Sequence, residues 1–226
     1  MKIERINTFY RRNLPHFQPI GAIFFVTFRL HNTLPKDVWQ ELRDQFELAR
    51  DKILREQTDV TEALDELHRR SFGRFDHALE HRANPDQHHL KDPRLAREVI
   101  KQLHRFDGDR YELLAYCVMS NHVHLLIDTK VQLQEEVDTH CWGEIDFTPL
   151  HVIMKSIKGA SAYFCNQLLG KTGTFWQHES YDRVPRSPEE YARIVRYILL
   201  NPVKAGLVDH WEDYPYTYYK YADQLI

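Results

Sequence analysis

The order and composition of its segments predict that this chain of 226 residues forms an α+β domain with a small antiparallel sheet. Residues 21–30 are rich in aromatic and β-branched side chains, which favour a buried strand. Two further apolar runs, 111–119 and 122–127, are separated only by Ser120 and Asn121 and therefore indicate neighbouring strands. Segments with helical periodicity lie between and after these strands.

The helices are predicted from apolar spacing and from their end signals. Residues 36–70 have apolar side chains at helical spacing and predict a long amphipathic helix, with or without a break. Proline begins a second helix over 93–106, and a third covers 149–169. The last helix follows Ser187, whose side chain suits the N-cap position, and runs to about Leu200.

Composition and cysteine usage predict a globular cytoplasmic protein. Hydrophobic residues make up 42% of the chain, and no apolar run approaches the ~18 residues of a membrane span. The three cysteines are widely spaced and form no CxxC pair, which favours a reducing compartment. No apolar core follows the charged N-terminal residues, so we expect neither a secretory signal nor membrane contact.

The net charge of −3 argues mildly against a nucleic-acid partner, but the charge is unevenly distributed. Residues 1–30 carry five basic side chains and one acid, and residues 150–208 carry eight basic and four acidic ones. Acids concentrate in 36–70 and 128–146. The two ends of the chain could therefore build a phosphate-binding face, with the acidic middle turned away. An ordinary solvated surface is the alternative.

The candidate chemistry centres on a His-x-His pair in the strand predicted over 122–127. Alternate side chains of a strand share a face, so His122 and His124 project together, about 7 Å apart, while Val123 and Leu125 point to the other face. Two such imidazoles can hold one metal ion if a third ligand comes from elsewhere. Alone the pattern is weak, because 14 histidines in this chain produce a His-x-His pair about once by chance.

A second pair lies on the last predicted helix, where Tyr197 and Asn201 are four residues apart and share a face. Brought against the His-x-His strand, the pair would complete a phosphoryl-transfer site, in which a metal polarises a phosphate and the phenol attacks phosphorus. A free tyrosine titrates at about 10, so the metal or nearby bases must assist its deprotonation. The alternative is a core tyrosine, since Tyr191, Ile194 and Ile198 share the helical spacing.

Other kinds of site find less support in the sequence. His77 and His81 have the spacing of a helix-borne metal pair, but the pair lacks the glutamate of HExxH and a clear third ligand. A solvated helix face is the simpler interpretation of these two histidines. The chain has no GxSxG elbow, Walker loop or Rossmann glycine fingerprint, which argues against a serine hydrolase and a nucleotide-driven motor.

Four segments of the chain carry a family resemblance: FVTFRL, CVMSNHVHLLI, KSIKGASAYFCN and FWQHESYDRVPRSPEEYARIVRYILLNPVKAGLV. In this order they are similar to the REP-associated tyrosine transposases, which belong to the HUH single-tyrosine transposases of the insertion-sequence 200/605 type. The resemblance runs from about Tyr10 to Trp211. The motifs NHVHLLI and YILLNPVKAGLV, about 70 residues apart, are specific in combination.

The resemblance implies roles for individual residues. His122 and His124 match the metal-binding catalytic histidines, Tyr197 matches the nucleophile, and Asn201 matches the third ligand of a Mg²⁺ or Mn²⁺ ion. We also expect DNA contacts from a set of basic side chains, namely Lys158, Arg183, Arg11, Arg12 and His178. Unpaired bases could stack on aromatic side chains such as those of Trp176, Tyr181 and Tyr218.

The resemblance also implies a fold and an activity. It predicts one domain over 1–226 with a ferredoxin-like antiparallel sheet, helices packed on one face, and a helical insertion at 35–109. The implied protein is a metal-dependent transposase or endonuclease that cleaves and rejoins hairpin-bearing single-stranded DNA through a 5′-phosphotyrosine, as a monomer or homodimer. Two alternatives are a transposase-derived protein that binds such DNA without strand transfer, and a metal-dependent nuclease in which Tyr197 is structural. Ser120 replaces the family's usual proline before NHVH, which should loosen that turn without touching a ligand.

Overall fold

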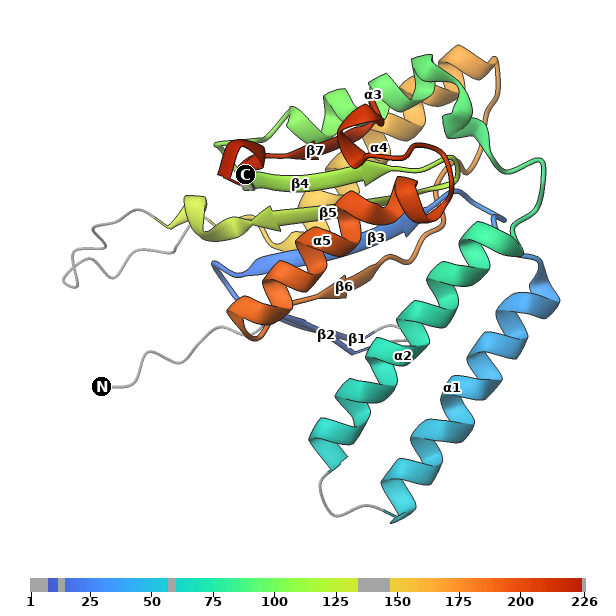
Figure 1. Cartoon of the computed structure of the whole chain (residues 1–226), viewed down its shortest axis with the longest axis vertical. Coiled ribbons are helices and arrows are strands. Elements are labelled where there is room, and N and C mark those ends of the chain that lie inside the picture. Colours follow the sequence, from blue (N-terminus) through green and yellow to red (C-terminus); the bar gives the residue numbers. More distant parts are fainter. Residues whose placement is uncertain (1–7, 12–14, 57–59, 134–146, 225–226) are drawn as a thin grey trace.

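The computed structural model describes residues 8–11, 15–56, 60–133 and 147–224 of the chain (Figure 1). A two-stranded sheet near the N-terminus consists of β1 (Thr8–Arg11) and β2 (Pro15–Gln18). The main sheet has five antiparallel strands: β3 (Ile23–Arg29), β4 (Glu112–Val118), β5 (His122–Asp128), β6 (Tyr181–Arg183) and β7 (Thr217–Tyr219). The helices are α1 (Lys36–Glu56), α2 (Val60–His81), α3 (Pro93–His104), α4 (Leu150–Leu169) and α5 (Pro188–Lys204).

The main sheet confirms the predicted α+β class and has ferredoxin-like connectivity. Along the chain, β3, α3, β4, β5, α4 and β6 form two βαβ units, and the strand order in the sheet is β6-β3-β5-β4-β7. All neighbouring strands in it are antiparallel. The two strands predicted on either side of Ser120 and Asn121 are β4 and β5, which pair in the centre of the molecule.

One face of the sheet packs against the two crossover helices. Side chains from β3 and β5, such as Val26, Leu125 and Ile127, form a buried cluster with α3 and α4. This is the arrangement with helices on one face that the sequence predicts for the ferredoxin-like core. The structure adds α5 on the opposite face, where Ile198 and Leu199 pack against a second buried cluster. Helices therefore cover both faces of the sheet.

The ends of the helices follow from local sequence. Asp92 caps α3 by accepting a hydrogen bond from the backbone N–H of Arg94, and Ser187 caps α5 by accepting one from Glu190. Helix α4 ends at Gly170, whose φ of 61° is in the left-handed region that glycine tolerates. Helix α5 continues to Lys204 rather than ending near 200, so that its buried Asn201 remains helical.

Helices α1 and α2 pack against each other as a hairpin beside the sheet (Figure 1). The segment predicted to be helical over 36–70, with or without a break, forms two helices, and α2 extends eleven residues beyond it to His81. A small buried cluster that includes Val38 and Leu79 joins the two helices near the sheet. Within the described part of 35–109, α3 packs on the sheet as a crossover helix, α2 packs in part against the opposite face, and the outer part of the α1–α2 hairpin projects from the sheet.

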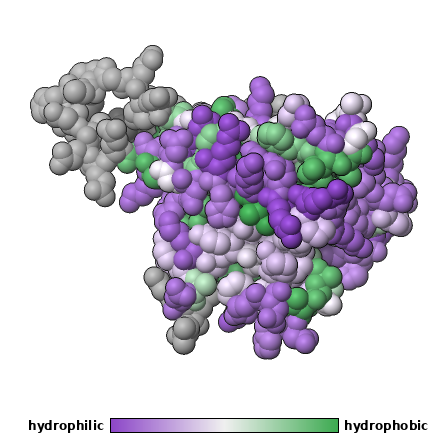
Figure 2. Space-filling model, turned by 90° about the horizontal axis from the view of Figure 1, so that it is seen from above, coloured by the Kyte–Doolittle hydropathy of each residue, from purple (hydrophilic) through white to green (hydrophobic). Residues whose placement is uncertain are grey.

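The outer surface is mixed in character. Viewed from above, it is mostly hydrophilic with small hydrophobic patches (Figure 2). None of the helices formed by the described residues combines the length and the apolar composition that a membrane crossing needs.

Truncating a core side chain at the sheet centre should destabilise the fold far more than truncating an exposed one. Leu125→Ala removes a fully buried side chain from β5 and should lower the free energy of unfolding by about 2–5 kcal/mol, because a cavity replaces its contacts. Leu48→Ala, on the exposed part of α1, should change it by less than about 0.5 kcal/mol. Urea denaturation of both variants tests this, and equal effects would contradict the assigned core.

Candidate active site

The two histidines of β5 lie on the sheet face that is covered by α5 and α2, and both are buried. The antiparallel register places His124 opposite Thr27 and His122 opposite Arg29. Thr27 Oγ1 is 2.8 Å from His124 Nδ1, and Asn121 Oδ1 is 2.6 Å from His122 Nδ1. The Nε2 atoms of the two rings consequently face each other at 3.1 Å.

Asn121 determines which nitrogen of His122 carries the proton. Its Nδ2 atom donates to the carbonyl oxygen of Leu79 on α2, at 2.8 Å, so its Oδ1 atom must be the one that faces His122. An oxygen acceptor at Nδ1 requires a proton there, which leaves a lone pair on Nε2. An outer hydrogen bond of this kind orients a metal-binding histidine.

Helix α2 contributes a buried carboxylate, Asp76, that the sequence analysis missed. Its Oδ1 atom lies 3.3 Å from Nε2 of His124 and 3.9 Å from Nε2 of His122. One signal in the sequence could have identified it: an acidic residue at the apolar spacing of a helix, four residues after Phe72 and three before Leu79. Because the apolar spacing was followed only over 36–70, the position of Asp76 went unused.

Helix α5 brings Tyr197 and Asn201 to the same place, on the shared face that their spacing predicts. The Tyr197 hydroxyl donates a hydrogen bond to Oδ2 of Asp76, and its ring centroid lies 5.2 Å from that of His124. Asn201 is fully buried, with Nδ2 3.2 Å from Nε2 of His124. All of these side chains belong to one copy of the chain.

Burial and charge set the protonation of the cluster. Burial, together with the neighbouring imidazole of His124, lowers the pKa of His122 to about 3, so the His122 imidazole is neutral at pH 7. Burial opposes ionisation of Asp76, but the neighbouring histidines and the hydrogen bond from Tyr197 hold the pKa of its carboxyl below the usual range. Burial, with the Asp76 charge, raises the pKa of Tyr197 well above its ordinary value, so the phenol is protonated.

The cluster fits a divalent metal ion. Ligand atoms of Asp76, His122 and His124 all lie within 4.8 Å of one another. Asp76 Oδ1 and Asn201 Oδ1 are buried without a hydrogen-bond partner, which is costly unless a cation or a donor binds each of them. Rotating the Asn201 amide by half a turn would point that oxygen at the histidine nitrogens.

The other candidate metal pair lies elsewhere on α2. His77 and His81 are exposed, and their rings stack with centroids 4.1 Å apart. Among the described residues, neither belongs to a group of three or more potential ligands. The solvated helix face is thus the interpretation that the geometry favours.

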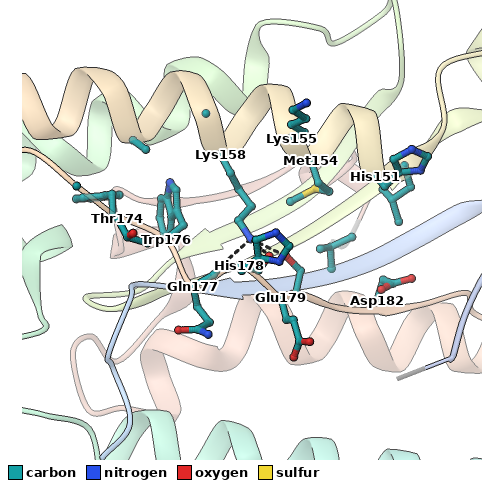
Figure 3. Close-up of a pocket in the computed structure, with 17 residues that line it drawn as sticks. His151, Met154, Lys155, Lys158, Thr174, Trp176, Gln177, His178, Glu179 and Asp182 are labelled. Carbon is teal, nitrogen blue, oxygen red and sulfur yellow. Dashed lines mark hydrogen bonds between the residues drawn. The ribbon is translucent and has the colours of Figure 1, made fainter. Parts of the chain in front are cut away.

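The predicted DNA-contacting residues occupy different positions. Lys158 of α4 donates to the carbonyl oxygens of Gln177 and His178 and to Ser180 Oγ, at 2.7–3.1 Å, and so fixes the segment after α4 (Figure 3). The exposed His178 lines a cavity of about 590 Å³ beside α4. Arg12 lies outside the described residues, and Arg11 belongs to β1, where only the strand is described.

Arg183 of β6 forms ion pairs within the protein. Its guanidinium contacts Glu190 Oε1 at 2.6 Å and Asp65 Oδ2 at 3.0 Å, which ties α5 and α2 to the edge of the sheet. A DNA contact by this side chain remains a prediction. The surroundings nevertheless give it a role in positioning the helices that carry Tyr197 and Asp76.

The three aromatic residues considered for base stacking also differ. Trp176 is buried in the core, and its Nε1 atom donates to Ser161 Oγ. Tyr218 stacks on Tyr116 at the β4–β7 edge, with ring centroids 5.3 Å apart. Tyr181 lies next to the site, where it stacks on the ring of Phe72 at 4.3 Å.

Protonation of His122 should reduce stability at acidic pH. In the folded protein this imidazole has a pKa of about 3, whereas in the unfolded chain its pKa is about 6.5. The unfolded chain therefore binds more protons at acidic pH, and the stability of the fold decreases as the pH falls below 6.5. With metal chelated, the free energy of unfolding of the parent protein should fall between pH 7 and pH 5. In His122→Gln this fall should be smaller by up to about 2 kcal/mol. Urea unfolding at the two pH values measures this, and parallel losses would contradict it.

Comparison with known proteins adds an independent line of evidence. No model of a known protein family matches the chain. A curated protein of Haemophilus influenzae that is named as a REP-associated tyrosine transposase is 27% identical over 107 residues, which are 47% of this chain. The chain spans 58% of the length of that relative.

A solved structure of a REP-associated tyrosine transposase bound to a REP hairpin is also similar. It matches 92% of this chain and 80% of its own, with a TM-score of 0.47 and 20% identity. The resemblance to the REP-associated tyrosine transposases that the sequence motifs indicate is therefore confirmed by a curated relative.

Proposed function

We propose that this protein is a metal-dependent single-stranded DNA transposase or endonuclease, which cleaves and rejoins hairpin-bearing DNA through a 5′-phosphotyrosine at Tyr197. One observation carries the proposal: the Tyr197 hydroxyl, a buried pair of histidines and two oxygen-bearing side chains converge within one chain. The similarity to a curated relative named as a REP-associated tyrosine transposase supports the same activity.

The chain's own residues supply the nucleophile and a destination for its proton. The phenol of Tyr197 already donates to the ionised Asp76, so its proton can pass to that carboxylate as the phenolic oxygen approaches phosphorus. A bond forms between that oxygen and phosphorus, the bond from phosphorus to the 3′ oxygen breaks, and the departing oxygen takes up a proton. In the reverse direction a 3′ hydroxyl attacks the phosphotyrosine and restores the phenol.

His122, His124, Asp76 and Asn201 would hold the metal ion, which when bound supplies positive charge to the phosphate oxygens. Mg²⁺ and Mn²⁺ are the candidate ions. Mg²⁺ prefers an octahedron of oxygen atoms, so a set that contains two imidazoles suits Mn²⁺ better. At pH 7 the His122 imidazole is neutral and the Asp76 carboxyl is ionised, and these are the protonation states in which both side chains can bind a metal ion.

One copy of the chain contains every side chain that the proposed mechanism needs. Tyr197 lies against the histidines of its own sheet, which supports a site assembled within one chain, whether the protein acts as a monomer or as a homodimer. The DNA would approach from the side of α2 and of the segment that Lys158 fixes. Lys158, His178, Arg183 and the N-terminal Arg11 and Arg12 stay the candidate contacts with its phosphates.

Formation of a covalent adduct tests the proposal directly. Purified protein should form a metal-dependent adduct with hairpin DNA from the sequence flanking its gene, seen on a denaturing gel with Mn²⁺ and absent with EDTA. Tyr197→Phe and His122→Ala should abolish the adduct, whereas Tyr163→Phe, at an exposed tyrosine on α4, should retain it. Cleavage that survives Tyr197→Phe would indicate hydrolysis by a metal-dependent nuclease instead.

Metal affinity tests the proposed ligands separately from DNA chemistry. Asp76→Asn and Asn201→Ala should each weaken Mn²⁺ binding at least about tenfold, since even partners outside the ligand set commonly cost that much. His81→Ala, at the exposed pair on α2, should leave the affinity unchanged. Calorimetric titration supplies the comparison. If Asp76→Asn bound Mn²⁺ with unaltered affinity, Asp76 would not be a metal ligand, and its proposed role would be only to accept the proton of Tyr197.

A further inference from the structure

A cavity of about 210 Å³, here termed the hairpin pocket, lies between α1, α2 and the segment 177–181. It adjoins the active site through Thr27, which lines the pocket and contacts His124. Phe72 lines it as well and lies 5.8 Å from the ring of Tyr197. A strand of DNA whose phosphate reached Tyr197 would therefore have a neighbouring nucleotide at this pocket.

The walls of the hairpin pocket are unusually aromatic. Rings from α1, α2 and β6 face it: Trp39, Phe46, His68, Phe72, Phe75 and Tyr181. Side chains of this kind offer flat surfaces on which an unpaired base can stack, whichever base it is. The cavity is smaller than the ~300–1,000 Å³ that drug-sized ligands occupy, so it suits one base rather than several.

Three arginines line the same pocket. Arg29 is buried beside the rings of Trp39 and Phe75, with its guanidinium carbon 5.3 and 5.6 Å from their centroids. Arg43 and Arg50 are half exposed and pair with neighbouring acids on α1. Such exposed pairs contribute little stability, so these two guanidinium groups can exchange a carboxylate for a phosphate at low cost.

Glu47 of α1 also lines the pocket, and Gln177 and Glu179 lie on its polar side. The side chains of Gln177 and Glu179 point away from α4 (Figure 3), and both line the hairpin pocket. The negative charge of Glu179 acts on Arg29, whose pKa burial lowers to about 10. Donors and acceptors thus surround the aromatic walls, as in sites that hold a flat polar ring.

We propose that the hairpin pocket binds one unpaired nucleotide next to the phosphate that Tyr197 attacks, with its base stacked among the aromatic rings and its phosphate held by the arginines. The inference rests on the proposed action on single-stranded DNA. Nucleotide binding at this pocket would give the α1–α2 hairpin a second function besides carrying Asp76. The hairpin would select DNA that is unpaired beside the cleaved bond.

Binding to two DNA probes tests the proposal, with metal chelated so that no cleavage occurs. Trp39→Ala should weaken binding of a short oligothymidylate by roughly five- to a hundred-fold, because a stacked base is lost. Its affinity for a blunt-ended DNA duplex, which has no unpaired nucleotides, should be unchanged. The matched control, Tyr163→Ala, removes an exposed aromatic ring from α4 and should alter neither affinity.

A second measurement uses the parent protein and does not depend on a variant that folds. An oligothymidylate carrying 5-iododeoxyuridine should cross-link under ultraviolet light to Trp39, Phe72 or Tyr181, as identified by mass spectrometry. Cross-links confined to other surfaces, or an equal effect of Trp39→Ala on both probes or on neither, would overturn the proposal. If the parent protein formed no covalent adduct but both binding results were as expected, the proposed function would be contradicted and the proposed nucleotide binding at the hairpin pocket would still hold.

Discussion

The contact between Asp76 and the imidazole of His124 is the interaction on which the rest of the site depends. A buried carboxylate is stable only when charges or donors surround it, and here β5 and α5 supply them. The need to surround this carboxylate brings together α2, β5 and α5, which are distant in sequence. It holds α2 over the histidines, gives Tyr197 an acceptor, and leaves one oxygen of Asp76 facing the imidazole nitrogens.

Other contacts reinforce the position of α2 at both ends. Near the sheet, the Asn121 amide donates to the Leu79 carbonyl, which at the same time sets the tautomer of His122. Farther out, Asp65 pairs with Arg183 and Arg186. The α1–α2 hairpin is therefore fixed relative to the active site even though its outer part projects from the sheet, and the hairpin pocket between them has a defined shape.

Local patterns were sufficient to predict which side chains of one element share a face, whereas the roles of these side chains were implied by the family resemblance. Alternation in β5 put His122 and His124 on one face, and a spacing of four put Tyr197 and Asn201 on another. Asp76 could not be placed in the same way, because its role comes from packing between α2 and a sheet about fifty residues later in the chain. Arg183 shows the same limit: its basic charge suggested DNA, but its position beside Glu190 and Asp65 is a tertiary property.

The continuation of α5 past 200 explains how one helix can carry both the proposed nucleophile and a proposed metal ligand. Had the helix ended before Asn201, that amide would not lie one turn from Tyr197, and its position beside His124 would depend on a loop. Since both side chains are fixed to the same buried helix, any displacement of α5 moves both together. In the proposed reaction, a displacement of α5 that carried a covalently bound DNA strand away from the histidines would therefore also withdraw Asn201 from the proposed metal site.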